Sequence, residues 1–184
     1  MCHKSRVRPV AVLLALVALL VISQGLSMDW DMGQRRGQKS AFLMMRRLSR
    51  ALEAFRRTNG AYPARIAPLH DFFIEAAISE DQYEDRDFAE FQWRKVVDAD
   101  HASGYLYEYR PSDPMASKPV LFTHYALHAD PVERGRTGFR SFYVDDNGSI
   151  RWNGERQATA TDPIPDVDPI LDVHSFWTEG PRPW

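Results

Sequence analysis

Two groups of side chains in this sequence have the types and spacing that could bind a metal ion. The first is the histidine pair His124 and His128, to which His101, Asp130 and His174 could be added only through the fold. Two strand residues four apart lie on one face, about 13 Å apart at ~3.3 Å per residue. One zinc ion cannot bridge that separation, so we expect no zinc site here.

The second group is the segment Asp145-Asp146-Asn147-Gly148, whose carboxylate and amide oxygens are of the kind that bind calcium. A single turn supplies too few oxygens for the six to eight ligands of that ion. Asn-Gly also suits a tight hairpin turn, because glycine readily adopts a positive φ. We therefore interpret the segment as a turn between two strands.

Nucleophilic and phosphate-binding patterns are absent from the sequence. Ser141 and Ser149 do not stand in a nucleophile elbow. Gly135 and Gly138 lie between two predicted strands, whereas the glycines of a phosphate-binding loop precede a helix and a Lys-Ser/Thr pair. The sequence therefore predicts no catalytic residue, no metal, no cofactor and no enzyme activity.

Four runs of β-favouring residues carry these side chains, at 104–110, 122–129, 139–144 and 149–152. Short connections between the last three predict an antiparallel meander. In the first run, period two puts Tyr105, Tyr107 and Tyr109 on one face and Leu106 on the other. A tyrosine face can bind a ligand, but packing beneath a helix is the commoner use, and we favour it here.

Residues 34–59 are predicted to form the helix that covers this sheet. Apolar residues recur at the spacing of one helical face, namely Met44, Met45, Leu48, Ala51, Leu52 and Phe55. Most arginines of the segment fall on the other side, namely Arg46, Arg47, Arg50, Arg56 and Arg57. Gly60 can adopt the left-handed conformation of a helix C-terminus, and Pro63 prevents continuation.

An acidic connection follows this helix. Tyr62, Ile66 and Leu69 are expected to anchor a proline-containing loop, and Asp71 is expected to cap a short helix at 72–79. A further helix is predicted at 85–97 with its apolar side chains facing inward, namely Phe88, Phe91 and Val96. Because no glycine-centred ligand loop accompanies the carboxylates, we interpret them as solvated helix faces.

Length and charge limit the classes of protein that fit. The 184 residues suit one domain with appendages, and 44% hydrophobic and 26% charged residues are ordinary for a folded chain. The single cysteine, Cys2, excludes an intrachain disulfide. Beyond residue 28 the chain has 20 basic and 25 acidic residues, and this acidic balance argues against nucleic acid as a partner.

The two ends are predicted to lie outside the central domain at 29–156. Residues 1–28 place Lys4, Arg6 and Arg8 before an apolar run at 10–22. This order favours an uncleaved signal anchor in the cytoplasmic membrane, with the domain exported to the periplasm, over a cleaved signal peptide and a secreted protein. Residues 157–184 contain five prolines and are read as an extended tail, laid over the domain by Ile170, Leu171, Phe176 and Trp177.

Three segments of the sequence resemble parts of a known family. They are AFRRTNGAYPARIAPL at 54–69, GYLYEYRP at 104–111 and YALHADPVERGRTGFRSFYVDDNGSIR at 125–151. Together with the order helix, connection and meander, they resemble the type IV pilins and the type II secretion pseudopilins over residues 35–152. The resemblance implies an α+β fold in which a long N-terminal helix packs on an antiparallel meander of three to four strands.

The same resemblance implies a function. The family's peptidase site, a glycine before Phe or Met with a glutamate five residues into the apolar helix, has no counterpart at 10–22. From the predicted anchor, the order of helix and sheet and the absence of a catalytic constellation, we expect a membrane-anchored, exported, pilin-like protein that acts without catalysis through protein contacts, in a secretion or pilus-related assembly. The alternative is a secreted or periplasmic module that binds a small ligand or cation.

Overall fold

The computed structural model describes residues 9–80, 86–99, 101–116 and 120–165, and of residues 9–33 it describes the backbone only. The chain divides into two units, Met1–Gly33 and Gln34–Trp184. Helix α1 belongs to both.

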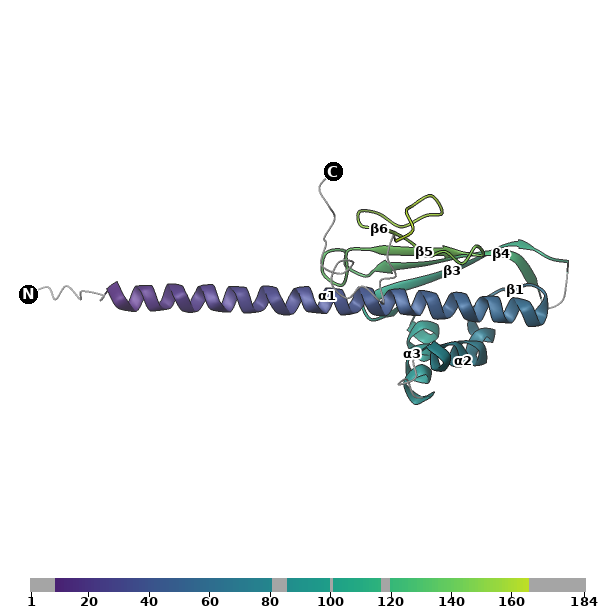
Figure 1. The fold of residues 1–184 in the computed structure, drawn as a ribbon, viewed down its shortest axis with the longest axis horizontal. Coiled ribbons are helices and arrows are strands. Elements are labelled where there is room, and N and C mark those ends of the chain that lie inside the picture. Colours follow the sequence, from purple (N-terminus) through teal and green to yellow (C-terminus); the bar gives the residue numbers. More distant parts are fainter. Residues whose placement is uncertain (1–8, 81–85, 100, 117–119, 166–184) are drawn as a thin grey trace, which may run out of the picture. The chain divides into compact units, whose positions relative to one another are not determined.

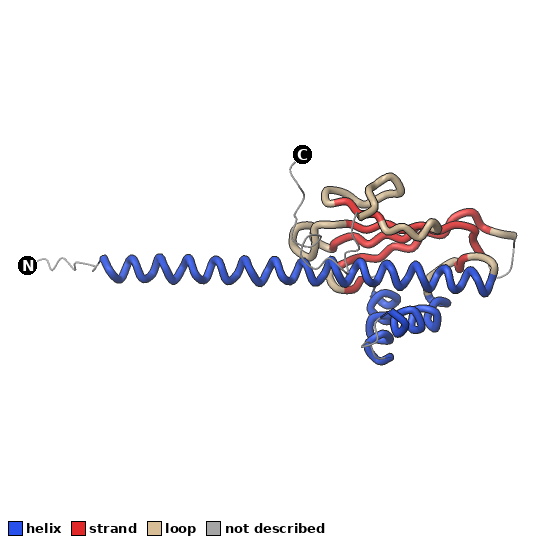
Figure 2. The backbone as a smooth tube through the Cα atoms, in the orientation of Figure 1, coloured by secondary structure: helices blue, strands red, loops and turns tan. Residues whose placement is uncertain are grey.

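All four described helical elements precede β2, so the helices come before most of the sheet along the chain (Figures 1 and 2). The helical elements are α1 (Pro9–Asn59), the 3-10 helix η1 (Ala67–Leu69), α2 (His70–Glu80) and α3 (Arg86–Ala99). The strands are β1 (Tyr62–Pro63), β2 (His101–Ala102), β3 (Tyr105–Pro114), β4 (Leu121–Pro131), β5 (Ser141–Asp145) and β6 (Arg151–Asn153). This architecture confirms the predicted α+β class.

The sheet is antiparallel throughout its main path, in the order β2-β3-β4-β5-β6, and β1 pairs with β4. All four predicted runs are strands. The two-residue strands β1 and β2 were not predicted, and β3 continues to Pro114, four residues beyond the predicted run at 104–110. The β2–β3 turn is tight, because Ser103 and Gly104 both have positive φ, 54° and 80°.

The part of helix α1 that belongs to the second unit, residues 34–59, lies between the sheet and the α2–α3 pair (Figure 1). On the sheet side, Phe42 meets Phe142 edge to face at 6.0 Å between ring centroids. On the other side, Phe55 meets Phe72 at 5.7 Å. Because this part of the helix is covered from both sides, its predicted apolar face is buried as expected, with Leu48 fully buried at the centre.

One predicted surface residue of α1 is buried. The sequence placed Arg47 with the other arginines on a solvated face, but its side chain is covered and its Nη1 donates to Gln92 Oε1 at 2.6 Å. Helix α3, which carries Gln92, covers that side of α1. The expectation of a solvated face is wrong for Arg47, although Arg50, Arg56 and Arg57 are exposed as predicted.

The helix ends where the sequence indicated. Gly60 has φ 81°, and its N–H donates to the Arg56 carbonyl at 2.7 Å. This is the glycine-terminated helix end that the Asn59-Gly60 pair predicted. Tyr62 and Leu69 are buried as the expected anchors of the following loop.

The predicted orientation of α3 is wrong for two of its three named residues. Phe88 and Phe91 are 48% and 56% exposed, whereas Ala89, Trp93 and Val96 are buried. Those three follow the i, i+4, i+7 spacing of one face. The ring centroids of Trp93 and Phe73 of α2 are 5.1 Å apart. This contact sets which face of α3 points inward, and on that face the small Ala89 takes the place expected for Phe88.

The membrane prediction is corrected by the structure. Among the described residues no helix is both long and apolar enough to cross a membrane. The apolar run at 10–22 has thirteen residues, about 20 Å of helix against a hydrocarbon layer of about 30 Å. This finding corrects the predicted signal anchor and the single-pass membrane location inferred from it.

Glycine permits one close contact at the end of the sheet. A Cβ at Gly138 would lie 2.0 Å from the Tyr105 hydroxyl oxygen, so that position admits no side chain. The same hydroxyl donates to the Arg140 carbonyl at 3.0 Å. The 132–140 connection is thus fixed against β3 rather than lying free between β4 and β5.

Candidate functional site on the outer face of the sheet

The sheet face that points away from α1 carries the polar side chains of β3, β4 and β5. Successive strand residues alternate between faces, so Glu108, His128 and Tyr143, which share one row of the register, lie on this outer face. Residues 154–162, here called the strap, follow β6 and fold over part of it (Figure 1). Ala158 of the strap is fully buried there.

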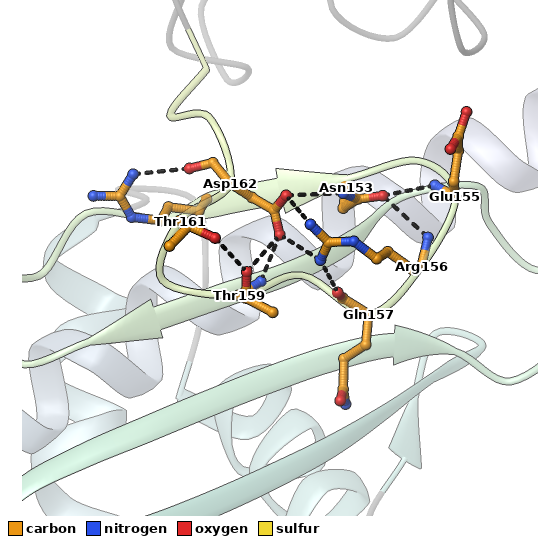
Figure 3. A network of polar contacts seen from close by, with 8 residues as sticks. Asn153, Glu155, Arg156, Gln157, Thr159, Thr161 and Asp162 are labelled. Atoms are coloured by element: carbon orange, nitrogen blue, oxygen red, sulfur yellow. Dashed lines mark hydrogen bonds and ion pairs between the residues drawn. The ribbon is translucent and has the colours of Figure 1, made fainter.

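A buried carboxylate organises the strap (Figure 3). Asp162 accepts hydrogen bonds from Asn153 Nδ2 at 2.9 Å, from the Thr159 N–H at 2.7 Å and from both terminal nitrogens of Arg156 at 2.8 and 2.9 Å. Burial alone would raise the pKa of Asp162, but the hydrogen bonds from Asn153, Thr159 and Arg156 outweigh it and hold the pKa below its ordinary value. The carboxylate therefore stays ionised as the acceptor for its donors.

The strap is also tied to the sheet. The Trp152 N–H donates to the Pro163 carbonyl at 3.2 Å, which brings the end of the strap back beside β6. Gln157 Nε2 donates to Asp130 Oδ2 of β4 at 2.7 Å. Arg134 Nη1 donates to the Gly154 carbonyl at 3.0 Å. Part of the predicted tail, residues 157–163, is therefore held against the sheet, and the tail anchors named at 170–177 lie outside the described residues.

His128 lies under the strap and is only 5% exposed. Its imidazole donates a hydrogen bond to the backbone of Ala158, and its ring lies edge to face on Tyr143 at 5.1 Å. The other ring nitrogen, Nδ1, is buried and has no hydrogen-bond partner among the described residues. Burial, followed by the positive charge of Arg110, lowers the pKa of His128, so the ring is neutral at neutral pH.

His124, four residues earlier on the same face, has a different environment. Its side chain is exposed, and Nδ1 lies 2.8 Å from Asp146 Oδ2. The hydrogen bond to that carboxylate raises the pKa of His124. The two histidines share a face, as predicted, but bind separate partners.

The other metal and catalytic candidates are likewise not gathered into one site. Within the described ranges, no group of three His, Cys, Asp or Glu side chains has the geometry to hold a metal ion. His101 is on β2, at the far side of β3 from β4, and His174 lies outside the described residues. Ser141 is buried and accepts a hydrogen bond from Arg134 Nη2.

The acidic segment behaves as a turn. Asp145 Oδ1 accepts from the Asn147 N–H at 3.0 Å, and the Asp145 carbonyl accepts from the Gly148 N–H at 2.8 Å. Gly148 has φ 73°, the positive value that Asn-Gly predicted. The segment is therefore a turn, as predicted, in which Asp145 accepts hydrogen bonds within the hairpin, and Asp146 pairs with His124 of β4.

The sequence did not reveal the strap. Its central groups, Asp162, Arg156 and Thr159, follow no helix or strand period, and their contacts span only a few residues. The available signals were Asn153-Gly154 and Asp162-Pro163, two pairs that favour turns and bracket the segment.

Comparisons with protein-family models, with curated proteins and with solved structures gave no match. The resemblance to pilins and pseudopilins gains no support from them.

Proposed function

We propose that this chain is a pilin-like module that acts through protein–protein contacts and not by catalysis. The order of its elements supports the proposal: the C-terminal part of one long helix is packed on an antiparallel sheet that follows it in sequence. The proposal includes a role in a larger assembly but no location in the cell.

The observation that carries it is the outward face of α3. Phe88 and Phe91, three residues apart on this helix, are both about half exposed. The ammonium of Lys95 lies 5.4 Å from the Phe91 ring centroid, so a basic side chain borders the aromatic one. Exposed aromatic residues near polar ones are typical of binding surfaces and are enriched among residues that dominate binding energy.

The alternative of a small-ligand module is less well supported. The tyrosine face that suggested it is turned toward α1: Tyr105 and Tyr107 are buried, and the Tyr125 hydroxyl lies 3.0 Å from Ser49 Oγ of that helix. These side chains contribute to the core, so the face is not open to a ligand.

A site-specific crosslink tests the proposal. A photoreactive phenylalanine analogue replaces Phe91 in the full chain, in the cells that produce it, and the matched control replaces Leu106, which is 48% exposed on the sheet. We expect a discrete crosslinked protein at position 91 and none at 106. The partner is then identified by mass spectrometry and its binding to purified chain measured.

A Phe91→Ser change should weaken that binding by about tenfold or more if Phe91 contributes as a dominant contact of at least ~1.4 kcal/mol. Leu106→Ser should leave it unchanged. The same products at both positions, or none at 91, would contradict a contact surface on α3.

A further inference from the structure

We propose that the strap is an acid-opened cover: when His128 gains a proton, residues 154–162 lift from the outer face of the sheet and expose His128 and Tyr143. The inference does not depend on the contact surface proposed for α3. It rests on the position of the imidazole, on the groups around it and on the way the strap is held.

The position of the ring makes a second proton unfavourable while the strap is closed. The imidazole already donates one hydrogen bond to Ala158. A proton added at Nδ1 would create a buried cationic N–H whose nitrogen has no acceptor in the described structure. A neutral nitrogen tolerates that site far better than a charged donor does, because desolvating an unpaired charge costs much more than desolvating a lone pair.

The charges facing His128 do not remove this penalty. From β3, Arg110 opposes a second positive charge, while Glu108 favours it. From its own strand Asp130 favours it, but Oδ2 of Asp130 is bonded to Gln157 of the strap. Glu108 is likewise bonded to Arg110, at 2.5 and 2.7 Å.

The remaining neighbours of His128 carry no charge. From β5 the neighbour is Tyr143, and from the strap it is the Ala158 backbone. Burial is the largest influence and keeps the ring neutral.

The strap can move without losing its own structure. Its internal contacts converge on Asp162, whose pKa lies below the ordinary aspartate value, so they persist while His128 titrates. Among the described residues, its contacts with β4 are those of Ala158 with His128 and of Gln157 with Asp130. Its two ends are held elsewhere, where Arg134 donates to the Gly154 carbonyl and Arg151 to the Asp162 carbonyl. Protonation of His128 acts on the contact with Ala158, at the buried centre of the strap.

The direction of the pH dependence follows from linkage. In the closed form the pKa of His128 lies below its ordinary value, and in the open form it approaches that value. The open form therefore binds more protons, so closure is favoured at neutral pH and is weakened as the pH falls. Between the two pKa values the ratio of open to closed strap should rise about tenfold per pH unit.

Hydrogen exchange of the full chain tests this. Strap amides are followed from about pH 7.5 to about pH 4.5, a range that includes the ordinary histidine value of about 6.5, and rates are corrected for the intrinsic effect of pH. We expect protection of the amides at 157–159 to fall by about tenfold per pH unit at the lower end, while that of β4 stays constant. Constant protection throughout the range would overturn the proposal.

Two variants separate His128 from other titrating groups. His128→Gln keeps a donor for Ala158 but cannot gain a proton, so its strap protection should not depend on pH. His124→Gln, on the same face of the same strand, should retain the wild-type pH dependence. Loss of that dependence in the His124 variant alone would overturn the assignment to His128.

If the His128 variant does not fold, an NMR titration of the wild-type chain tests the proposal instead. The ring protons of His128 and the amides of Ala158 and Thr159 are followed by NMR through the same titration. If the His128 ring protons and the strap amides change with the same midpoint pH, the proposal is supported. Strap amides that follow His124, or that remain unchanged while His128 titrates, contradict it.

Discussion

The two sides of the sheet are covered in different ways. On the inner side, α1 packs through large apolar side chains such as Phe42 and Leu48, which meet Phe142 and its neighbours in one buried cluster. On the outer side, the strap is held by hydrogen bonds that converge on Asp162. Apolar burial contributes in proportion to area and without directional demands, whereas the strap depends on a few groups with exact partners. Loss of inner-layer contacts should therefore destabilise the whole domain, whereas loss of strap contacts should open the strap locally.

The largest effect is expected from the inner layer. Phe142→Ala removes a fully buried ring that contacts Phe42 and Tyr105, each at 6.0 Å between centroids. We expect a loss of about 3–5 kcal/mol in the free energy of unfolding, measured by urea denaturation. Leu106→Ala, on the exposed face, should cost less than about 0.5 kcal/mol. Equal losses in the two variants would show that the two faces do not differ as described.

The second effect concerns the strap alone. Asp162→Asn replaces the ionised acceptor of Asn153, Thr159 and Arg156 with an amide that cannot accept from all of them. Strap opening should become easier by about 1.5–3 kcal/mol, the range for hydrogen bonds to a charged group, as measured by hydrogen exchange of the strap amides. Glu155→Gln, which removes an exposed carboxylate from the same segment, is the control and should change little. If Asp162→Asn instead unfolded the whole domain, the strap would be part of the core and the comparison would fail.

The same contrast explains what the sequence predicted. The end of α1 at Asn59 and the four strand runs followed from periodic apolar positions and from Gly60, because those features depend on neighbours along the chain. The strap depends on Asp162 meeting Arg156 and Asn153, and such contacts leave no periodic trace. Its folding against the sheet was therefore missed.

Orientation was harder to predict than the elements themselves. In α3 the sequence favoured Phe88 and Phe91 as core residues because they are apolar. The face that packs is set by Trp93 against Phe73 and by the room that Ala89 leaves. Arg47 was misplaced for the same reason, since only the tertiary position of α3 brings Gln92 beside it. Both errors arise from packing between segments, which single-helix periodicity does not contain.

Two buried or half-buried histidines on the two sides of the sheet, His70 and His128, differ in the sign of their pH dependence. In the helical layer His70 lies between carboxylates: Nε2 is 2.8 Å from Glu90 Oε2 and Nδ1 is 2.8 Å from Asp71 Oδ1. These hydrogen bonds, first that of Glu90 and then that of Asp71, raise its pKa, which is opposite to the shift of His128. The contribution of His70 to stability is therefore complete below its ordinary value and is lost as the pH rises through the raised one.

His70→Gln tests that sign. The variant should lose stability relative to wild type below about pH 6, where a histidine of ordinary pKa is mostly charged, and the difference should vanish at alkaline pH. Because the side chain is 37% exposed, we expect only a few tenths of a kcal/mol. Urea denaturation at several pH values measures it. A difference that grows with pH would mean that the carboxylates do not stabilise the charged ring.

The smallest effect is expected at His124, the outer-face histidine that the strap does not bury. Asp146 raises the pKa of His124 through a hydrogen bond and through its negative charge, and the His124 side chain is exposed to solvent. Asp146→Asn should therefore lower the pKa of His124 toward its ordinary value, read from its ring protons by NMR, while the denaturation midpoint stays unchanged. His128 should titrate as before, because its pKa is set by burial and by Arg110 rather than by the hairpin turn. A shift of both histidines together would show that the outer face titrates as one coupled group, and the strap would then respond to the turn at Asp146 as well as to the ring beneath it.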